Sequence, residues 1–587
     1  MVASHIVICL HVLAPLCGVV PASADQQFEQ LAAQYVDQFP ALSPVTATQL
    51  GDHRYDSELD ELTELARKKS LRFHRDFLKR VIAIDAKQLA RANQVDHALL
   101  EHDLRAQLWQ IEVSQEWAWN PLIYTELAGG AIYGLMAREF APLPTRLGDV
   151  ADRLTKFPQM FEQIRAALDP RRVPRIHAET AIKQNRGVVS ILANMVEPHL
   201  GQLGNTERTR LIGAMEVAKQ AVEEYQSWLE TDLLPKALGD FRIGKKRFDE
   251  KLAFTLQTPL SRRQIRERAE NELRRVRAEM YQMAADVYRQ KHTYTQFPEN
   301  PSPEFQQAII RAALEMAYEE TPAADQVVEA ARKSLALTTS FVRDKDLITI
   351  PADPLEIIVM PEFQRGVSLA YCDSPGPLDV GQKTFYAVAP LPKNWNQQQI
   401  RSFLREYNLR SIHDLTVHEA MPGHFVQLAH SNRYPGKLRA VLASGVFIEG
   451  WAVYTEQMMA DEGLLDGDPL MGLIARKWYL RGIANAILDQ AIHTEGISRE
   501  QAMRLMMEDT FQEEREAAAK WIRAQLTSTQ LSTYFVGYLE HADLRRETEQ
   551  AWSDEFRLKT YHDKVLSFGS PPVKYVRALL LDKEIPR

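Results

Sequence analysis

The chain has 587 residues, of which 45% are hydrophobic and 9% aromatic. This composition is typical of a folded globular protein with a large core, and it excludes a disordered chain. The 70 basic and 78 acidic residues give a net charge of −8 and are spread along the whole length. Because no basic block or stripe could follow a phosphate backbone, we expect no nucleic acid partner.

The first 24 residues are typical of a signal peptide. An apolar stretch from Ile6 to Val20 is followed by Ala22-Ser23-Ala24, the small-x-small pattern that signal peptidase cleaves. A retained anchor stays open, although the stretch is short for one. Lipidation of Cys17 is a further alternative, but Leu16 before it is larger than the small residue that such processing requires. We predict export to the periplasm or the extracellular space, without stable membrane insertion after cleavage.

The mature chain is predicted to contain no disulfide. Of the three cysteines, Cys9 and Cys17 lie in the signal segment, which leaves Cys372 alone. Stability must therefore come from packing. No neighbouring signature marks Cys372 as a nucleophile, so a free buried thiol is the expected state.

Residues 25–345 are predicted to form a helical region that makes one wall of a cleft. Their apolar positions recur mostly at helical spacing, as in the series Leu154, Phe157, Phe161, Ile164 and Leu168. The glycine-rich stretch at 128–134 lacks the Lys-Ser/Thr pair of a phosphate loop. It is therefore interpreted as a helix-packing or turn segment.

Residues 346–587 are predicted to form a small sheet followed by a helical catalytic region, continuous with the first region as one structural unit. Four short β-rich runs occur, at 348–350, 356–360, 367–371 and 384–388. Helical periodicity returns at Gln397 and continues to about Tyr538. Within it, the polar stretch 497–519 is interpreted as solvated helix surface. The expected fold class is mostly α with a small β-sheet beside an active-site cleft.

A short motif in the second region supplies metal-binding chemistry. It reads His418-Glu419-Ala420-Met421-Pro422-Gly423-His424 and is followed 25 residues later by Glu449. Zinc hydrolases use three protein ligands and keep one position open for water. We predict His418, His424 and Glu449 as ligands of one zinc ion per chain. Glu419, adjacent to the first ligand, is the predicted general base.

The histidine spacing requires a break in the helix. Six residues rotate a helix by about 600°, which leaves His418 and His424 about 120° out of phase. Pro422 and Gly423 can interrupt the helix and return His424 to the metal. From spacing alone, the alternative stays open that the two histidines belong to separate helices without a shared ion.

A second helix is predicted from Gly445 to Gly463, with Glu449 and Glu456 on one face and roughly 10 Å apart. Two carboxylates so far apart do not easily bind one ion. Glu456 is therefore predicted to orient a ligand histidine in the second shell, with a structural ion pair as the alternative. His413 and His430, which flank the motif, are interpreted as histidines on or near the helix surface.

The motif together with Glu449-Gly450-Trp451-Ala452 resembles the bacterial HExxPGH family, uncharacterised proteins grouped with zinc metallopeptidases. It is similar, more distantly, to the thimet-oligopeptidase type of gluzincin, from which the histidine spacing departs by two residues. The resemblance implies a large helical gluzincin-like peptidase fold with a deep channel. It also implies that Tyr534 or Tyr538, from a late helix, donates to the developing oxyanion. Tyr534 is the first choice, although a core tyrosine is the alternative for either residue.

The predicted function is zinc-dependent hydrolysis of peptide bonds in short or unfolded peptides. Two alternatives stay open. The first is a zinc amidase acting on a non-peptide or modified amide. The second is an exported binding protein that keeps the fold without catalysis. The sequence does not distinguish endopeptidase from exopeptidase activity.

Overall fold

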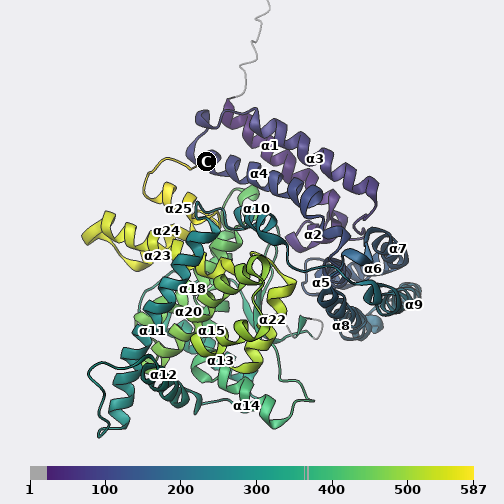
Figure 1. The fold of residues 1–587 in the computed structure, drawn as a ribbon. Helices are drawn as coiled ribbons and strands as arrows, with labels where there is room; N and C mark the ends of the chain where they lie inside the picture. Colours follow the sequence, from purple (N-terminus) through teal and green to yellow (C-terminus); the bar gives the residue numbers. More distant parts are fainter. Residues whose placement is uncertain (1–22, 362–363, 366–368, 587) are drawn as a thin grey trace, which may run out of the picture.

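The computed structural model describes residues 23–361, 364–365 and 369–586. This part of the chain is mostly helical and contains one small sheet, which confirms the predicted fold class. The predicted signal segment lies outside the described residues except for Ser23 and Ala24, where the first helix begins. Figure 1 shows the amino-terminal helices on one side of the molecule and the sheet and later helices on the other.

The amino-terminal helices form two groups with separate cores. In the first, Phe28, Phe77 and Leu104 pack between three helices: α1 (Ala24–Gln38), α3 (Glu64–Ile82) and α4 (Arg91–Trp109). The second group consists of α2 (Pro44–Leu50), α5 (Leu122–Met136), α6 (Leu143–Thr155), α7 (Phe157–Ala167), α8 (Arg175–Ile191) and α9 (Asn205–Trp228). The predicted apolar series is buried in its core. The glycine-rich stretch at 128–134 lies within α5, as the helix-packing interpretation requires.

The next helices pack against the carboxy-terminal half, and the first of them also contacts α4 through Phe254 and Glu250. They are α10 (Gly244–Leu256), α11 (Arg262–Lys291), α12 (Pro303–Tyr318) and α13 (Val327–Asp344). Met280 and Ala284 of α11 share a core with Leu473 and Ile483, which belong to the later helix α20. The predicted boundary near residue 345 is therefore crossed by a common core.

The sheet has three strands: β1 (Leu355–Val359), β2 (Ala370–Asp373) and β3 (Thr384–Val388). The central strand β3 pairs with β1 in parallel and with β2 in antiparallel orientation. The predicted run at 348–350 forms no strand, because Ile348 packs into the core from a loop. Of the predicted run at 367–371, residues 367 and 368 lie outside the described part. β2 is an edge strand of the sheet.

The carboxy-terminal half is a helical assembly around the sheet. Its helices are α14 (Gln397–Glu406), α15 (Leu409–Glu419), α16 (His424–Ser431), α17 (Lys437–Val441), α18 (Gly445–Asp461), α19 (Leu464–Gly467), α20 (Pro469–Gln490), α21 (Arg499–Arg504), α22 (Glu514–Leu526), α23 (Ser532–Trp552), α24 (Leu558–Leu566) and α25 (Val573–Leu580). Figure 1 shows α15, α18 and α20 side by side in its interior.

Helices α18 and α23 cross with their backbones in contact. A Cβ atom on Gly537 would lie 2.3 Å from the carbonyl oxygen of Val446, and one on Gly450 would lie 2.3 Å from the carbonyl carbon of Gly537. No side chain fits at either position, so glycine permits the close crossing. The crossing holds the residue before Gly450 close to the first turn of α23.

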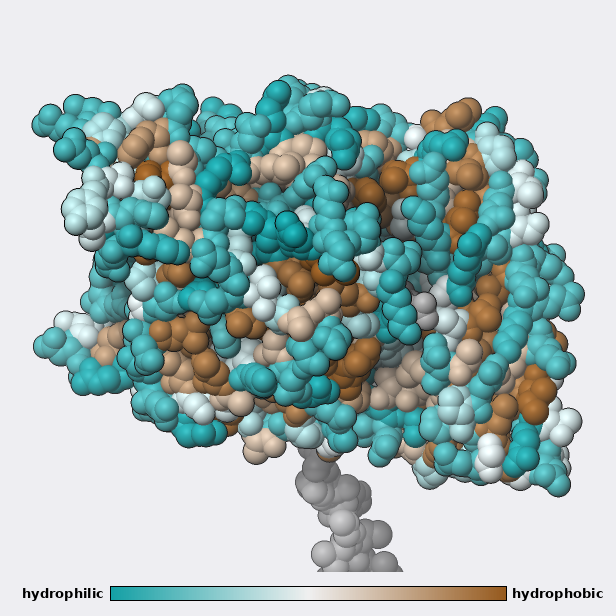
Figure 2. Space-filling model, turned by 90° about the horizontal axis from the view of Figure 1, so that it is seen from below, coloured by the Kyte–Doolittle hydropathy of each residue, from teal (hydrophilic) through white to brown (hydrophobic). Residues whose placement is uncertain are grey.

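The face of the molecule seen from below is predominantly polar. Figure 2 shows hydrophilic side chains over most of the lower face, with hydrophobic residues in recesses between them. Among the helices of the described residues, none combines the length and the hydropathy needed to cross a bilayer.

Candidate metal centre

The backbone breaks between the two histidines of the motif. Helix α15 ends at Glu419 and α16 begins at His424. In the intervening turn the Met421–Pro422 peptide bond is cis, and the N–H of Gly423 donates to the carbonyl of Val417 at 2.9 Å. A Cβ atom on residue 423 would lie 1.9 Å from the carbonyl oxygen of His418, so only glycine fits.

This break returns the second histidine to the first. The ring centroids of His418 and His424 lie 4.7 Å apart, with the rings nearly perpendicular. The two histidines lie on separate helices, as the alternative from the spacing had it, but the turn between the helices brings their rings together. The two imidazoles instead converge on one point in a common cavity.

Glu449 of α18 completes the group. Its Oε2 atom lies 3.6 Å from Nε2 of His418 and 3.6 Å from Nε2 of His424. A tetrahedral zinc site with bonds of about 2.0–2.1 Å places its ligand atoms about 3.4 Å apart. The Oε2 atom of Glu449 is buried and accepts no hydrogen bond from the described residues. A cation at the centre would satisfy this atom, so these three residues fit a metal ion.

Helix α18 also holds the break in place. The indole N–H of Trp451 donates to the carbonyl of Pro422 at 3.0 Å, and the side chain of Trp451 is 1% exposed. Three successive residues thus have distinct tasks. Glu449 faces the histidines, Gly450 contacts α23, and Trp451 fixes the turn before His424.

Two turns later on the same helix, Glu456 contacts the other side of His418. Its Oε1 atom lies 2.5 Å from Nδ1 of His418, and the residue is 3% exposed. A carboxylate on Nδ1 keeps the proton there and leaves the Nε2 lone pair for a cation held between His418 and Glu449. This is the geometry that the predicted second-shell role requires.

Charge within the group favours an ionised Glu449. Burial alone would raise the pKa of this carboxyl, but its interactions with His418 and His424 lower it below its ordinary value. For His418, burial lowers the pKa, whereas the nearby carboxylate of Glu449 and the hydrogen bond to Glu456 raise it well above its ordinary value. A carboxylate that stays ionised at neutral pH is the form that binds a metal.

Asp414 is a neighbour that the sequence pattern did not single out. It lies one helical turn before His418, is fully buried, and has no hydrogen-bond partner on either oxygen among the described residues. Burial and then the nearby charge of Glu456 raise its pKa well above the ordinary range. In the sequence, only its position four residues before His418 could have indicated that Asp414 lies near the site.

The group formed by His418, His424 and Glu449 lines a cavity of about 370 Å³. Glu419 lines it, is 7% exposed, and accepts no hydrogen bond from the described residues. Its carboxylate is therefore available to a molecule in the cavity. Tyr371 and Cys372 of strand β2 line the same space. Burial, and then Glu419, raise the pKa of the Cys372 thiol well above its ordinary value, so it stays protonated, as expected for a free buried cysteine.

Of the two predicted tyrosines, only Tyr534 reaches the cavity. Its ring lies 6.4 Å from the ring of His418. Its hydroxyl oxygen accepts from Arg523 Nη2 at 3.1 Å and from Gln530 Nε2 at 3.3 Å. Tyr538, one turn later, packs against Tyr479 at 4.3 Å and does not line the cavity, because the helix turns its side chain into the core.

The two flanking histidines have other partners. His413 Nδ1 lies 2.9 Å from Ser334 Oγ, and His430 Nε2 lies 2.8 Å from the carbonyl oxygen of Thr349. Neither lines the cavity. Both have the peripheral role that the sequence interpretation gave them.

The interpretation of the polar stretch 497–519 as solvated helix surface is wrong. Glu516 in this stretch lines the cavity, as do Lys520 and Arg523 directly after it. These residues are spaced by four and three positions along α22, so they share one helix face. Arg481 of α20 joins them. Periodic charges on a single face were the signal that could have revealed this wall.

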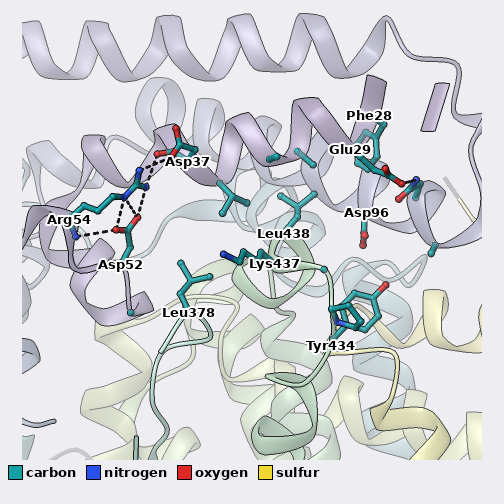
Figure 3. A pocket seen from close by; sticks show the side chains of 18 of the residues that line it. Phe28, Glu29, Asp37, Asp52, Arg54, Asp96, Leu378, Tyr434, Lys437 and Leu438 are labelled. Atoms are coloured by element: carbon teal, nitrogen blue, oxygen red, sulfur yellow. Dashed lines mark hydrogen bonds and ion pairs between the residues drawn. The ribbon is translucent and has the colours of Figure 1, made fainter. Parts of the chain in front are cut away.

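A larger cavity, of about 950 Å³, lies elsewhere, between α1, α4 and the segment around α17. Figure 3 shows one group of paired charges in it: Arg54 contacts Asp37 and Asp52. Asp96 at its other end pairs with the buried Arg439. Within the described residues, one close group of three side chains could hold a metal ion, and it belongs to the smaller cavity. We therefore assign the candidate site to the smaller cavity.

The comparisons with known proteins concern nearly the whole chain. A family model described as "Bacterial protein of unknown function (DUF885)" matches residues 44–580. The chain belongs to this family. A solved structure from Shewanella oneidensis, described as a candidate lipoprotein of unknown function, is 33% identical, with a TM-score of 0.78, over 94% of this chain and 99% of that one.

A second solved structure, a candidate lipoprotein from Colwellia psychrerythraea, shares the fold. It has a TM-score of 0.77 at 19% identity and covers 96% of this chain and 99% of its own. Among the curated proteins, none matches this chain. The resemblance to HExxPGH zinc-metallopeptidase-like proteins and to the thimet-oligopeptidase type was therefore wrong. The family that matches, DUF885, is described only as being of unknown function.

We predict that Glu456→Gln lowers the affinity of this DUF885 protein for zinc by about 10–100-fold, because His418 loses the carboxylate that orients its ring. Competition with a chromophoric chelator measures the affinity. Glu462→Gln, at the end of the same helix and outside the cavity, is the matched control. Equal affinities of the two variants would contradict the orienting role of Glu456.

Proposed function

We propose that this chain is a zinc-dependent hydrolase of peptide bonds in short or unfolded peptides. The observation that carries the proposal is a buried group of three ligand atoms within 4.8 Å of one another, with an unpartnered Glu419 in the same cavity. DUF885 and the neighbouring structures have no described activity, so the support comes from the chemistry of the residues. The three ligands are His418, His424 and Glu449.

Two imidazole nitrogens and one carboxylate are a ligand set that suits zinc. When bound, zinc acidifies a water molecule and polarises the carbonyl of the substrate. The protein contributes ligand orientation: Glu456 holds His418, and Trp451 holds the turn that carries His424. We propose one zinc ion per chain.

Glu419 is the proposed general base. It follows the ligand His418 directly, so its carboxylate lies beside the metal-binding group and faces the same cavity. It accepts a proton from the attacking water and later gives that proton to the leaving amine. A purely non-catalytic binding protein has no need of such a residue.

Tyr534 is the proposed oxyanion donor. Its oxygen already accepts hydrogen bonds from Arg523 and Gln530, so its own O–H is left to donate elsewhere. A phenol fixed in this way stabilises negative charge on the reacting oxygen without rearranging during the reaction.

Strand β2 is the proposed substrate platform. It is an edge strand, and Tyr371 and Cys372 line the cavity. An extended peptide can pair with such an edge through backbone bonds and so tolerate varied side chains. The cavity volume of about 370 Å³ lies within the range of small-ligand sites, which favours short peptide segments.

Export is part of the proposal. Its support is the signal-like segment at residues 1–24 and the description of both neighbouring structures as candidate lipoproteins. Those descriptions also give weight to Cys17 as an alternative lipid attachment site. A zinc amidase acting on modified amides is the second enzymatic candidate, since the same residues would attack any amide held there.

We predict that Glu419→Gln binds zinc as the parent does but loses hydrolysis by about 10²–10⁴-fold, because the proton acceptor is removed and the ligands are kept. Mass spectrometry of a digested peptide library measures the activity, and small non-peptide amides in parallel separate peptidase from amidase. Undiminished hydrolysis by the variant would contradict the role of Glu419. No hydrolysis by the parent protein when loaded with zinc would favour the non-catalytic alternative.

We predict that Tyr534→Phe lowers kcat by about 10²–10³-fold with little change in KM, because the lost hydrogen bond forms in the transition state. Tyr538→Phe, one turn along the same helix and outside the cavity, is the comparison and should keep the parent rate. Steady-state kinetics on one fluorogenic peptide suffices. A larger loss in Tyr538→Phe than in Tyr534→Phe would reverse the assignment.

A further inference from the structure

One wall of the cavity is made of cations. Arg481 projects from α20, and Lys520 and Arg523 project from adjacent turns of α22. All three line the same space as His418 and Glu449. Lys520 has no role in the proposed hydrolysis. The only role of Arg523 in it is the hydrogen bond to Tyr534.

The two acidic groups closest to Arg481 are already engaged. Glu516 accepts from Arg481 Nη2 at 2.5 Å and from the hydroxyl of Tyr407 at 3.1 Å. Glu406 accepts from Lys477 at 2.7 Å and has Arg481 Nη1 at 3.6 Å. Glu406 is therefore paired with Lys477, and Glu516 is paired with Arg481, which also lies near Glu406.

Lys520 has no comparable partner. Its side chain is 5% exposed and forms no hydrogen bond with the described residues, and its ammonium reaches Glu516 only at 4.0 Å. Burial, and then repulsion by Arg481, lower the pKa of Lys520 to about 7. A buried ammonium without an anion is costly, and an incoming carboxylate would relieve that cost.

Arg523 also lacks an anion. Within the described part of the chain, no carboxylate oxygen lies within 4.0 Å of its guanidinium in an ion pair. Its Nη2 donates hydrogen bonds to the neutral side chains of Gln530 and Tyr534. Two cations thus face the cavity with capacity for one further anion.

We propose, on the basis of the proposed peptidase function, that Lys520 and Arg523 bind the free C-terminal carboxylate of the substrate, which makes the protein a carboxypeptidase. The carboxylate is the anion that every unblocked peptide carries, and an arginine beside a lysine is a suitable receptor for it. The enzyme would then act near the C-terminus rather than within a chain.

The distances limit the length of the released piece. Arg523 Nη2 lies 3.1 Å from the hydroxyl of Tyr534, and the ring of Tyr534 lies 6.4 Å from that of His418. An extended residue spans about 3.3–3.6 Å. A carboxylate held beside Tyr534 therefore leaves room for one or two residues between it and the scissile bond.

The test compares one N-acetylated peptide as the free acid and as the C-terminal amide. The account predicts that the parent protein hydrolyses the acid with kcat/KM about 100-fold above the amide, and that mass spectrometry detects the loss of one or two C-terminal residues. Lys520→Met should lower kcat/KM for the acid by about 10–100-fold, mainly through KM, and leave the amide unchanged. Lys68→Met, an exposed lysine on α3, is the charge-matched control.

Calorimetric binding to the Glu419→Gln variant separates this inference from the proposed hydrolysis. Tighter binding of the acid than of the amide supports the carboxylate site even if the parent protein hydrolyses neither peptide. Equal hydrolysis of acid and amide, with Lys520→Met affecting both alike, would overturn the carboxylate site and leave the hydrolase proposal standing. If the peptide amide is hydrolysed as fast as the acid once the peptide carries an acidic side chain near its C-terminus, the assignment to the terminal carboxylate is overturned.

Discussion

The helix break between His418 and His424 is the constraint on which the site depends. Without it, six residues of helix would point the two imidazoles in different directions. The break needs a residue without a side chain, since a Cβ atom on Gly423 would lie 1.9 Å from the carbonyl oxygen of His418. It is held from outside by Trp451, on the same helix that carries Glu449. The proposed ligand Glu449 and the supporting residue Trp451 are therefore positioned by one helix, α18.

Much of this site could be predicted from the sequence because its signals are local. The two histidines, Glu419 and Glu449 stand in short runs whose chemistry is legible without the fold. Glu456 was placed by helix phase alone, two turns after Glu449, and its contact with His418 follows from that phase. The sheet was found for the same reason, since β-rich runs bounded by Pro and Gly are local patterns.

What the sequence did not reveal depends on contacts between distant segments. The cationic wall joins α20 and α22, and the pattern of α22 alone looked like a solvated surface. Tyr534 and Tyr538 lie one turn apart, and only the packing of α23 against α18 decides which of them faces the cavity. Ile348 has the composition of a strand but fills the core from a loop, because tertiary packing overrides local propensity. The family was likewise identified only by comparison, through the DUF885 model that matches residues 44–580.

The central claim is that one metal ion joins His418, His424 and Glu449. Elemental mass spectrometry of the purified protein, beside a His424→Ala variant of confirmed fold, tests it most directly. The account predicts near one zinc per chain in the parent protein and loss of that zinc in the variant, because two remaining ligands bind the ion far more weakly. A parent protein that takes up no metal under saturating zinc, or a variant that retains it in full, would contradict the account.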